Sequence, residues 1–121
     1  MITSWVAESN QDVIKHYAID KTAGTFTWIE TYGSKGTLDN QFKDPFDLEV
    51  VGHTLIVADT ANNKLKVWNT QTDSFVEAFN GGTTIPKGKF QQPQGLDVGP
   101  DGHLWVCEQR TERLQQFILN I

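Results

Sequence analysis

The chain has 121 residues, of which 38% are hydrophobic, and it carries a formal net charge of −5. Four Trp, two Tyr and seven Phe provide enough apolar material for a packed core, which excludes global disorder. The acidic balance makes a nucleic-acid partner an unfavoured interpretation, because such proteins usually present a basic face. A single cysteine excludes an internal disulfide and fits a reducing compartment.

The N-terminal residues have neither a basic start nor a long apolar run. Nowhere does the sequence approach the roughly 20 consecutive apolar residues that a membrane-spanning helix needs. The sequence therefore predicts no signal peptide and no membrane association. It predicts a cytoplasmic location if the chain is complete, and leaves the location unknown if the chain is a fragment.

A pair of short strands is predicted three times along the chain. Each copy has an apolar pair, a small residue and a carboxylate, then a polar turn, then an aliphatic residue with an aromatic residue three places on. The copies cover residues 5–17, 56–68 and 105–117. The carboxylates at the end of the first strand in each copy are Glu8, Asp59 and Glu108.

Further segments align around these copies and complete a repeat of about 48 residues. That length fits four short strands with four turns. For the middle repeat we expect strands over residues 45–50, 54–60, 64–68 and 74–79, each rich in β-branched or aromatic residues and bounded by turn residues. The segment 55–58 is apolar on both faces, which is typical of a strand packed between two other layers.

These residues resemble the NHL family of β-propellers. The family pattern has a Phe and a Pro before the inner strand, a Val-Ala-Asp-Thr strand and an Asn-Asn turn. Residues 41–68 match it closely, residues 88–117 match with more departures, and residues 5–33 match only the last three strands of a blade.

The resemblance implies an all-β fold, a partial β-propeller of four-stranded antiparallel blades with strand order b-c-d, a-b-c-d, a-b-c. In such a blade, strand a lines the central channel. We expect one partial propeller over residues 1–121, with blade repeats at approximately 1–33 (incomplete), 43–80 and 92–121 (incomplete).

An open stack of blades leaves two apolar faces in water, so we expect them to be covered. A homo-oligomer, most simply a dimer that closes a six-bladed ring, is one interpretation. The missing blades of a larger parent protein are the second. A different partner chain is the third.

Several carboxylates are candidates for either structure or binding. Glu8, Asp59 and Glu108 are expected to accept hydrogen bonds from backbone N–H groups of the following turn, with a ligand role on one propeller face as the alternative. Asp47 and Asp97 fall on predicted inner strands. They are weak candidates for metal binding, because carboxylate oxygens suit Ca²⁺, and solvated strand residues are the alternative. No other cofactor is expected.

The remaining reactive side chains are interpreted as structural. His53 and His103 fall in predicted turns and are expected to be exposed. Cys107 aligns with Ala58, so we expect a small, buried and inert thiol. The sequence contains no catalytic motif, and no catalytic residue is predicted.

The longest loops are predicted on one face of the ring, which makes that face the expected binding surface. The binding-face candidates are Lys43, Asp47, Lys87 and Arg110. The resemblance favours a binding or scaffold module with a protein or peptide ligand. The alternative is part of a propeller enzyme with a site in the channel, such as a metal-dependent hydrolase, a lyase or a phytase-like phosphatase.

Overall fold

The structure is a computed structural model that describes residues 2–81 and 89–119. Within these ranges ten strands form three antiparallel sheets, and one turn of 3-10 helix, η1 (Thr60–Asn62), connects two strands. The first sheet contains β1 (Ile2–Glu8), β2 (Val13–Asp20) and β3 (Thr25–Tyr32). The second contains β4 (Pro45–Val51), β5 (Thr54–Asp59), β6 (Lys64–Asn69) and β7 (Ser74–Phe79). The third contains β8 (Pro93–Val98), β9 (His103–Glu108) and β10 (Arg113–Ile118).

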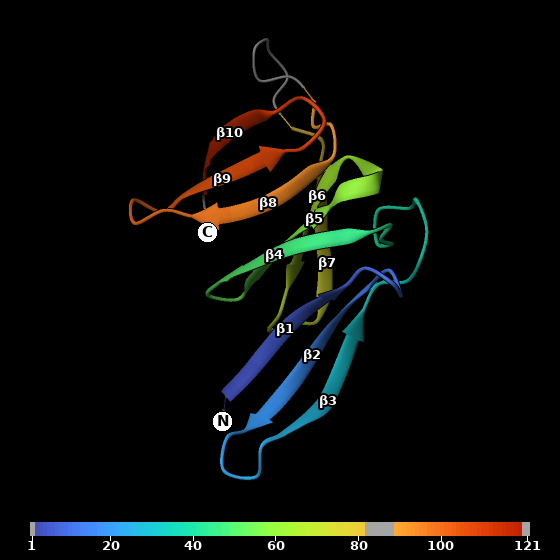
Figure 1. Ribbon diagram of the computed structural model, residues 1–121, viewed down its shortest axis with the longest axis vertical. Coiled ribbons are helices and arrows are strands. Elements are labelled where there is room, and N and C mark those ends of the chain that lie inside the picture. The colour runs from blue at the N-terminus through green and yellow to red at the C-terminus, as the bar shows by residue number, and fades with distance from the viewer. Residues whose placement is uncertain (1, 82–88, 120–121) are drawn as a thin grey trace.

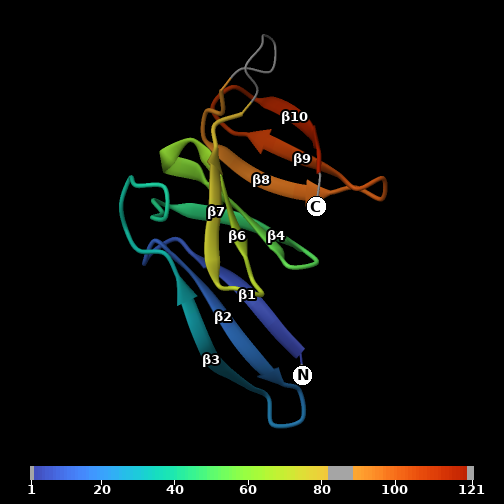
Figure 2. The same ribbon diagram turned by 180° about the vertical axis from the view of Figure 1, so that it is seen from behind.

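The three sheets stack face to face as successive blades (Figure 1). β1 contacts β4, and β4 contacts β8, so these strands lie side by side along one edge of the stack. Figure 2 shows the stack from behind, with β7 at the outer edge of the second sheet. The sheets of three, four and three strands confirm the predicted all-β architecture and the order b-c-d, a-b-c-d, a-b-c. Within the described ranges no helix is long and apolar enough to cross a membrane.

Hydrogen bonds join the turns of neighbouring blades at repeated positions. Asp12 (φ 58°) and Asn63 (φ 58°) occupy the same left-handed position in the turns after β1 and η1. The Asp12 Oδ1 atom accepts a hydrogen bond of 2.6 Å from the backbone N–H of Asp44 in the next blade. Asn63 Oδ1 accepts the equivalent bond of 2.8 Å from the N–H of Gln92. Asn and Asp tolerate left-handed φ, which explains why these residue types serve as the links.

The core consists of two layers between the sheets. Between the first and second sheets the buried residues are Ile14, Tyr32, Phe42, Leu55, Val57 and Trp68. Between the second and third sheets they are Ile56, Ala58, Leu65, Phe90, Leu96, Leu104 and Val106. β5 contributes alternate residues to both layers, as its two apolar faces predict. Phe42 and Phe90 hold equivalent places, each just before an inner strand.

The outward faces of the first and third blades expose residues whose counterparts in the middle blade are buried. Leu114 is 56% exposed, whereas its counterpart Leu65 is 2% exposed. Cys107 is exposed, whereas its counterpart Ala58 is fully buried. The prediction of a buried Cys107 is therefore wrong in this structure. The reason is physical: the repeat position is apolar because a blade covers it in the middle of the stack, and no described residues cover it in the third blade.

The link between the second and third blades can be tested with two substitutions at one site. Asn63→Gly keeps the left-handed backbone but removes the acceptor for Gln92, and we expect it to lower the free energy of unfolding by about 1 kcal/mol. Asn63→Asp keeps an acceptor oxygen at this position, as Asp12 does between the first two blades. Its free energy of unfolding should therefore stay close to that of the parent. Urea unfolding followed by tryptophan fluorescence measures both. Equal stability of Asn63→Gly and the parent would contradict the link.

Candidate functional site

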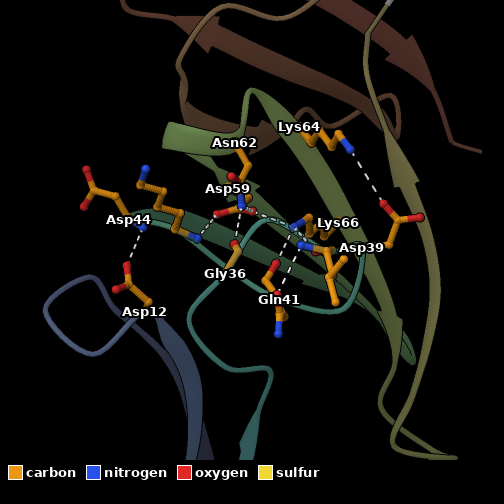
Figure 3. Close-up of polar contacts among 11 residues, drawn as sticks. Asp12, Gly36, Asp39, Gln41, Asp44, Asp59, Asn62, Lys64 and Lys66 are labelled. Atoms are coloured by element: carbon orange, nitrogen blue, oxygen red, sulfur yellow. Dashed lines mark hydrogen bonds and ion pairs between the residues drawn. The ribbon is translucent and has the colours of Figure 1, made fainter.

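Asp59 is a fully buried carboxylate at the end of β5 and is surrounded by hydrogen-bond donors (Figure 3). Its Oδ1 atom accepts a bond of 2.7 Å from the backbone N–H of Lys43. Its Oδ2 atom lies 2.7 Å from Asn62 Nδ2 and 2.7 Å from Lys66 Nζ. The side chains of Asp59 and Lys66 are both 0% exposed, so this is a desolvated ion pair. Such a pair requires further hydrogen bonds to offset the loss of hydration.

Lys66 obtains those further bonds from the loop that connects the first two blades. Its Nζ donates to the backbone carbonyl of Leu38 at 3.0 Å and to that of Gln41. The ammonium also lies 5.7 Å from the centre of the Phe42 ring, within the range of a cation–π contact. The ion pair thus fixes residues 33–42 against the second blade, directly before the inner strand β4.

The third blade builds the same arrangement with the positive charge moved by two residues. Glu108 Oε1 accepts a bond of 2.8 Å from the backbone N–H of Gln91, the counterpart of Lys43. Gln115, the counterpart of Lys66, donates to Glu108 Oε2 at 2.8 Å. Arg113 binds the same carboxylate at 2.7 Å and donates to the carbonyl of Lys89 at 2.9 Å. The cation lies at the position of Lys66 in the second blade and at the position of Arg113 in the third. At either position on strand c it binds both the buried carboxylate and a backbone carbonyl of the preceding loop.

In the first blade the equivalent pair is open. Lys15 Nζ lies 3.9 Å from Glu8 Oε1, and the two side chains are 21% and 28% exposed. Tyr17 also reaches this carboxylate, with a long contact of 3.4 Å from its hydroxyl. The pair is looser because no described loop or blade covers this face, in contrast to Asp59 and Lys66.

The backbone donors to Asp59 and Glu108 differ from the predicted ones. They come from the loop before the inner strand, whereas the sequence suggested the turn that follows. Strand a pairs antiparallel with strand b, with Pro45 opposite Asp59 and Pro93 opposite Glu108. The end of strand b therefore lies beside the start of strand a. Sequence reasoning also missed Lys66, although a lysine seven residues after a repeated carboxylate, as in Lys15, was a usable signal.

The neighbouring inner strands β4 and β8 carry three carboxylates, Asp47, Glu49 and Asp97. Asp47 bridges the two strands, because its Oδ2 atom accepts a bond of 2.8 Å from the N–H of Leu96. Its Oδ1 atom accepts a bond from the N–H of Leu48, so both oxygens are occupied. Burial, and secondly the negative charges of Asp47 and Asp97, raise the pKa of the Glu49 carboxyl. Glu49 is half-buried on β4 and Asp97 is exposed on β8.

The described residues do not provide a complete set of ligands for the predicted metal site. Among the residues that the structure describes, no group of three or more His, Cys, Asp or Glu side chains could hold a metal ion. Asp47 and Asp97 would need donors from elsewhere to bind Ca²⁺, which prefers six to eight oxygen ligands. Their role as metal ligands remains a prediction.

The loop-face candidates are placed separately. Lys43 and Arg110 are exposed, before β4 and after β9 respectively, and Lys87 lies outside the described residues. His53 is exposed in a turn, as predicted. His103 instead begins β9 and is half-buried, with its Nδ1 atom 2.8 Å from Gln116 Nε2.

The third blade is similar to a known repeat family. Residues 90–117 match the family model of the NHL repeat. Residues 90–117 are an NHL repeat. This NHL repeat contains Phe90, the three strands β8, β9 and β10, and the carboxylate Glu108 with its donor Gln91. The second blade has the same parts at the same spacing, with Phe42, Lys43 and Asp59.

The relatives of the chain are longer proteins. A gluconolactonase from Zymomonas mobilis is 29% identical over an alignment of 69 residues that covers 54% of this chain and 19% of that protein. A protein assigned as a 6-phosphogluconolactonase from Bacteroides fragilis superposes with a TM-score of 0.64 and 21% identity, over 98% of this chain and 34% of its own. An auxiliary nutrient binding protein from Bacteroides thetaiotaomicron gives a TM-score of 0.73 at 13% identity, over 94% of this chain and 34% of its own. These likenesses confirm the partial β-propeller fold, and the chain spans about a third of either solved structure.

Removal of the buried Lys66 charge tests the ion pair. Lys66→Met leaves Asp59 buried without its cation, and we expect a loss of about 3 kcal/mol in the free energy of unfolding. Lys66→Gln should lose less, because an amide at this position donates to the carboxylate in the third blade. Urea unfolding monitored by circular dichroism provides the comparison. If the two variants were equally stable, the pairing of Asp59 with a strand c donor would not be the stabilising contact.

The pH dependence of stability should have opposite signs at Glu108 and Glu49. Burial alone would raise the pKa of the Glu108 carboxyl, but hydrogen bonds from Arg113, Gln115 and the Gln91 N–H together hold it below the ordinary 4.5. Its stabilisation is therefore present above pH 4.5 and is lost as the pH falls through the lowered pKa. Glu49 has a raised pKa, so its ionisation reduces stability as the pH rises above 4.5.

Glutamine variants separate these two effects. Glu108→Gln should be less stable than the parent by about 2 kcal/mol at pH 7, with a smaller difference near pH 3.5. Glu49→Gln should be more stable than the parent at pH 7 and equal to it near pH 3.5. Urea unfolding at the two pH values measures both differences. If the difference in free energy of unfolding between Glu49→Gln and the parent did not change with pH, the raised pKa of Glu49 would be contradicted.

Proposed function

We propose that this chain is part of a β-propeller binding module and that its ligand contacts the channel carboxylates of the inner strands. The observation that carries the proposal is the position of Glu49 and Asp97 on adjacent inner strands. There, burial and neighbouring negative charge raise the pKa of Glu49. Ligand sites concentrate perturbed ionisable groups in this way, because water is partly excluded from them.

The charge of the channel suggests the chemistry of the ligand. Three carboxylates on two strands disfavour an anion and favour neutral hydroxyl groups, which donate hydrogen bonds to carboxylate oxygens. Asp47 is already bound to Leu48 and Leu96, so the ligand would meet Glu49 and Asp97. A small neutral polyhydroxylated molecule, whose hydroxyl groups donate hydrogen bonds, fits these acceptors. The names of the relatives, a nutrient binding protein and two lactonases, support a small-molecule ligand.

The second candidate is part of a metal-dependent lactone hydrolase. The likeness to a gluconolactonase favours it. In such an enzyme a Ca²⁺ ion would bind Asp97 or Asp47 together with donors that the described residues do not include. The ion would polarise the lactone carbonyl as a Lewis acid. This candidate differs from the first in its requirement for the metal.

Under either proposal, further blades would complete the ring. The outward faces of the first and third blades expose the apolar positions that the middle blade buries, so each is suited to pack on another blade. Two copies in a dimer would provide six blades, and a longer protein would provide the rest from its own sequence. A protein or peptide ligand at Lys43, Arg110 and the neighbouring loops remains a further prediction.

Titration calorimetry distinguishes the two candidates. We expect a neutral polyol such as D-glucitol to bind the chain without added metal, and the Glu49→Gln, Asp97→Asn double variant to bind about tenfold more weakly. Glu77→Gln on the exposed outer strand β7 is the matched control and should bind like the parent. Binding of Ca²⁺, with polyol binding only in its presence, would favour the hydrolase. Binding of neither would contradict both channel proposals.

A further inference from the structure

Asn80 and Gly81 directly follow β7 and begin the connection from the second blade to the third. Asparagine is a thermolabile residue type, because its side-chain amide can be attacked by the next backbone nitrogen. Glycine at that next position leaves the approach open, since it has no side chain and a freely adjustable backbone. Asn80 is the only asparagine of the sequence that glycine follows, and it is exposed.

The backbone nitrogen of Gly81 is not held by the surrounding fold. Gly81 has a φ of 106°, which residues with a side chain rarely adopt. Its pairing with Lys89 is an isolated pair outside the strands. Among the described residues, no carbonyl accepts a hydrogen bond from the Gly81 N–H group. The nitrogen can therefore turn toward the neighbouring side chain without breaking a bond within the described structure.

Other asparagine side chains are bound to the backbone. Asn69 Oδ1 accepts bonds of 2.9 and 3.1 Å from two N–H groups of its own turn. Asn62 Nδ2 donates to a backbone carbonyl at 2.9 Å and to Asp59 at 2.7 Å. Asn63 forms the link to the third blade described above. In the described part of the chain the Asn80 side chain makes no such bond.

The dipeptide of Asp101 and Gly102 has the same spacing but a protected side chain. Asp101 Oδ1 accepts a bond of 3.0 Å from the N–H of His103, and its Oδ2 atom lies 3.1 Å from His103 Nδ1. An ionised carboxylate with both oxygens engaged is a poor target for a nucleophile. Asn80 is therefore the exposed position where sequence and structure together leave the reaction open.

We infer that Asn80 is a site of spontaneous deamidation, with the backbone nitrogen of Gly81 as the nucleophile. This nitrogen bonds to the Cγ atom of Asn80, the Cγ–Nδ2 bond breaks, and ammonia leaves with the proton of the Gly81 N–H group. The product is a cyclic succinimide. Water then opens the ring at one carbonyl to give aspartate, or at the other to give isoaspartate, in which the main chain runs through the side chain. The reaction does not depend on the channel ligand proposed above.

Isoaspartate would lengthen the main chain by a methylene carbon where the second and third blades are joined. The Asn80 carbonyl accepts a bond of 2.8 Å from the N–H of Phe90, which is 2% exposed in the core between these blades. Lys89, which pairs with Gly81, offers its carbonyl to Arg113. Deamidation therefore alters the segment that places Phe90 and binds Arg113.

The test is incubation of the folded full chain at neutral and at mildly alkaline pH, followed by peptide mapping with mass spectrometry. We expect the amide of Asn80 to become an acid, and to do so faster at the higher pH because the deprotonated backbone nitrogen attacks. Asn69 in the same sample is the internal control and should stay intact while half of Asn80 reacts. Protein isoaspartyl methyltransferase should label residue 80 of the product.

Two variants separate the chemistry from its structural effect. Asn80→Gln keeps an exposed amide but moves it one carbon further from the backbone nitrogen, so it should stay intact under the same conditions. Asn80→Asp has the charge of the product without the longer main chain. Hydrogen exchange of the Phe90 amide should be faster in the isoaspartate form than in the parent, and unchanged in Asn80→Asp.

Four outcomes would overturn the inference. Equal conversion of Asn80 and Asn69 would mean that the glycine and the free side chain have no effect. Conversion only in urea would mean that the fold holds Asn80 away from the Gly81 nitrogen. Aspartate without isoaspartate would indicate direct hydrolysis rather than a succinimide. Unchanged exchange of the Phe90 amide in the isoaspartate form would contradict the effect on the connection between the blades.

Discussion

Burial of both faces of each blade is the constraint on which the rest of this structure depends. β5 directs Ile56 and Ala58 to one side and Leu55 and Val57 to the other, and all four are buried. A sheet of this kind cannot be stable alone in water, because either uncovered face would expose apolar side chains. The middle blade meets this requirement within the chain. The first and third blades each meet it on one face only, and the exposed residues of their outward faces follow directly from that.

Hydrogen bonds and ion pairs at the ends of the strands allow the blades to pack closely without leaving polar groups unpaired. Where the backbone passes from one blade to the next, its N–H and carbonyl groups are close to an apolar core and need partners. A buried carboxylate accepts a hydrogen bond from the N–H group, and a cation on strand c donates one to the carbonyl. The middle blade uses Lys66 and the third blade uses Arg113, at different positions of the strand. Two solutions within one chain show that the contact to the loop, rather than a particular residue, is what the fold requires.

Most of the fold could be predicted from the sequence, because the repeat places short strands and turn residues at fixed intervals. Asp59 and Glu108 could be assigned a structural role for the same reason. Their donors could not, because Lys43 and Gln91 depend on how strand a lies against strand b. Cys107 was assigned wrongly because a repeat alignment carries over the burial of Ala58, and burial is a property of the neighbouring blade.

The inner strands carry carboxylates of two kinds. The inner strands β4 and β8 are held together by Asp47, which uses both carboxylate oxygens on backbone N–H groups. That link joins the two strands, and it makes Asp47 part of the scaffold. Glu49 and Asp97 lie on the same two strands, and within the described residues neither makes such a bond to the backbone. Substitution of Glu49 or Asp97 therefore leaves the bonds of Asp47 between the two inner strands in place.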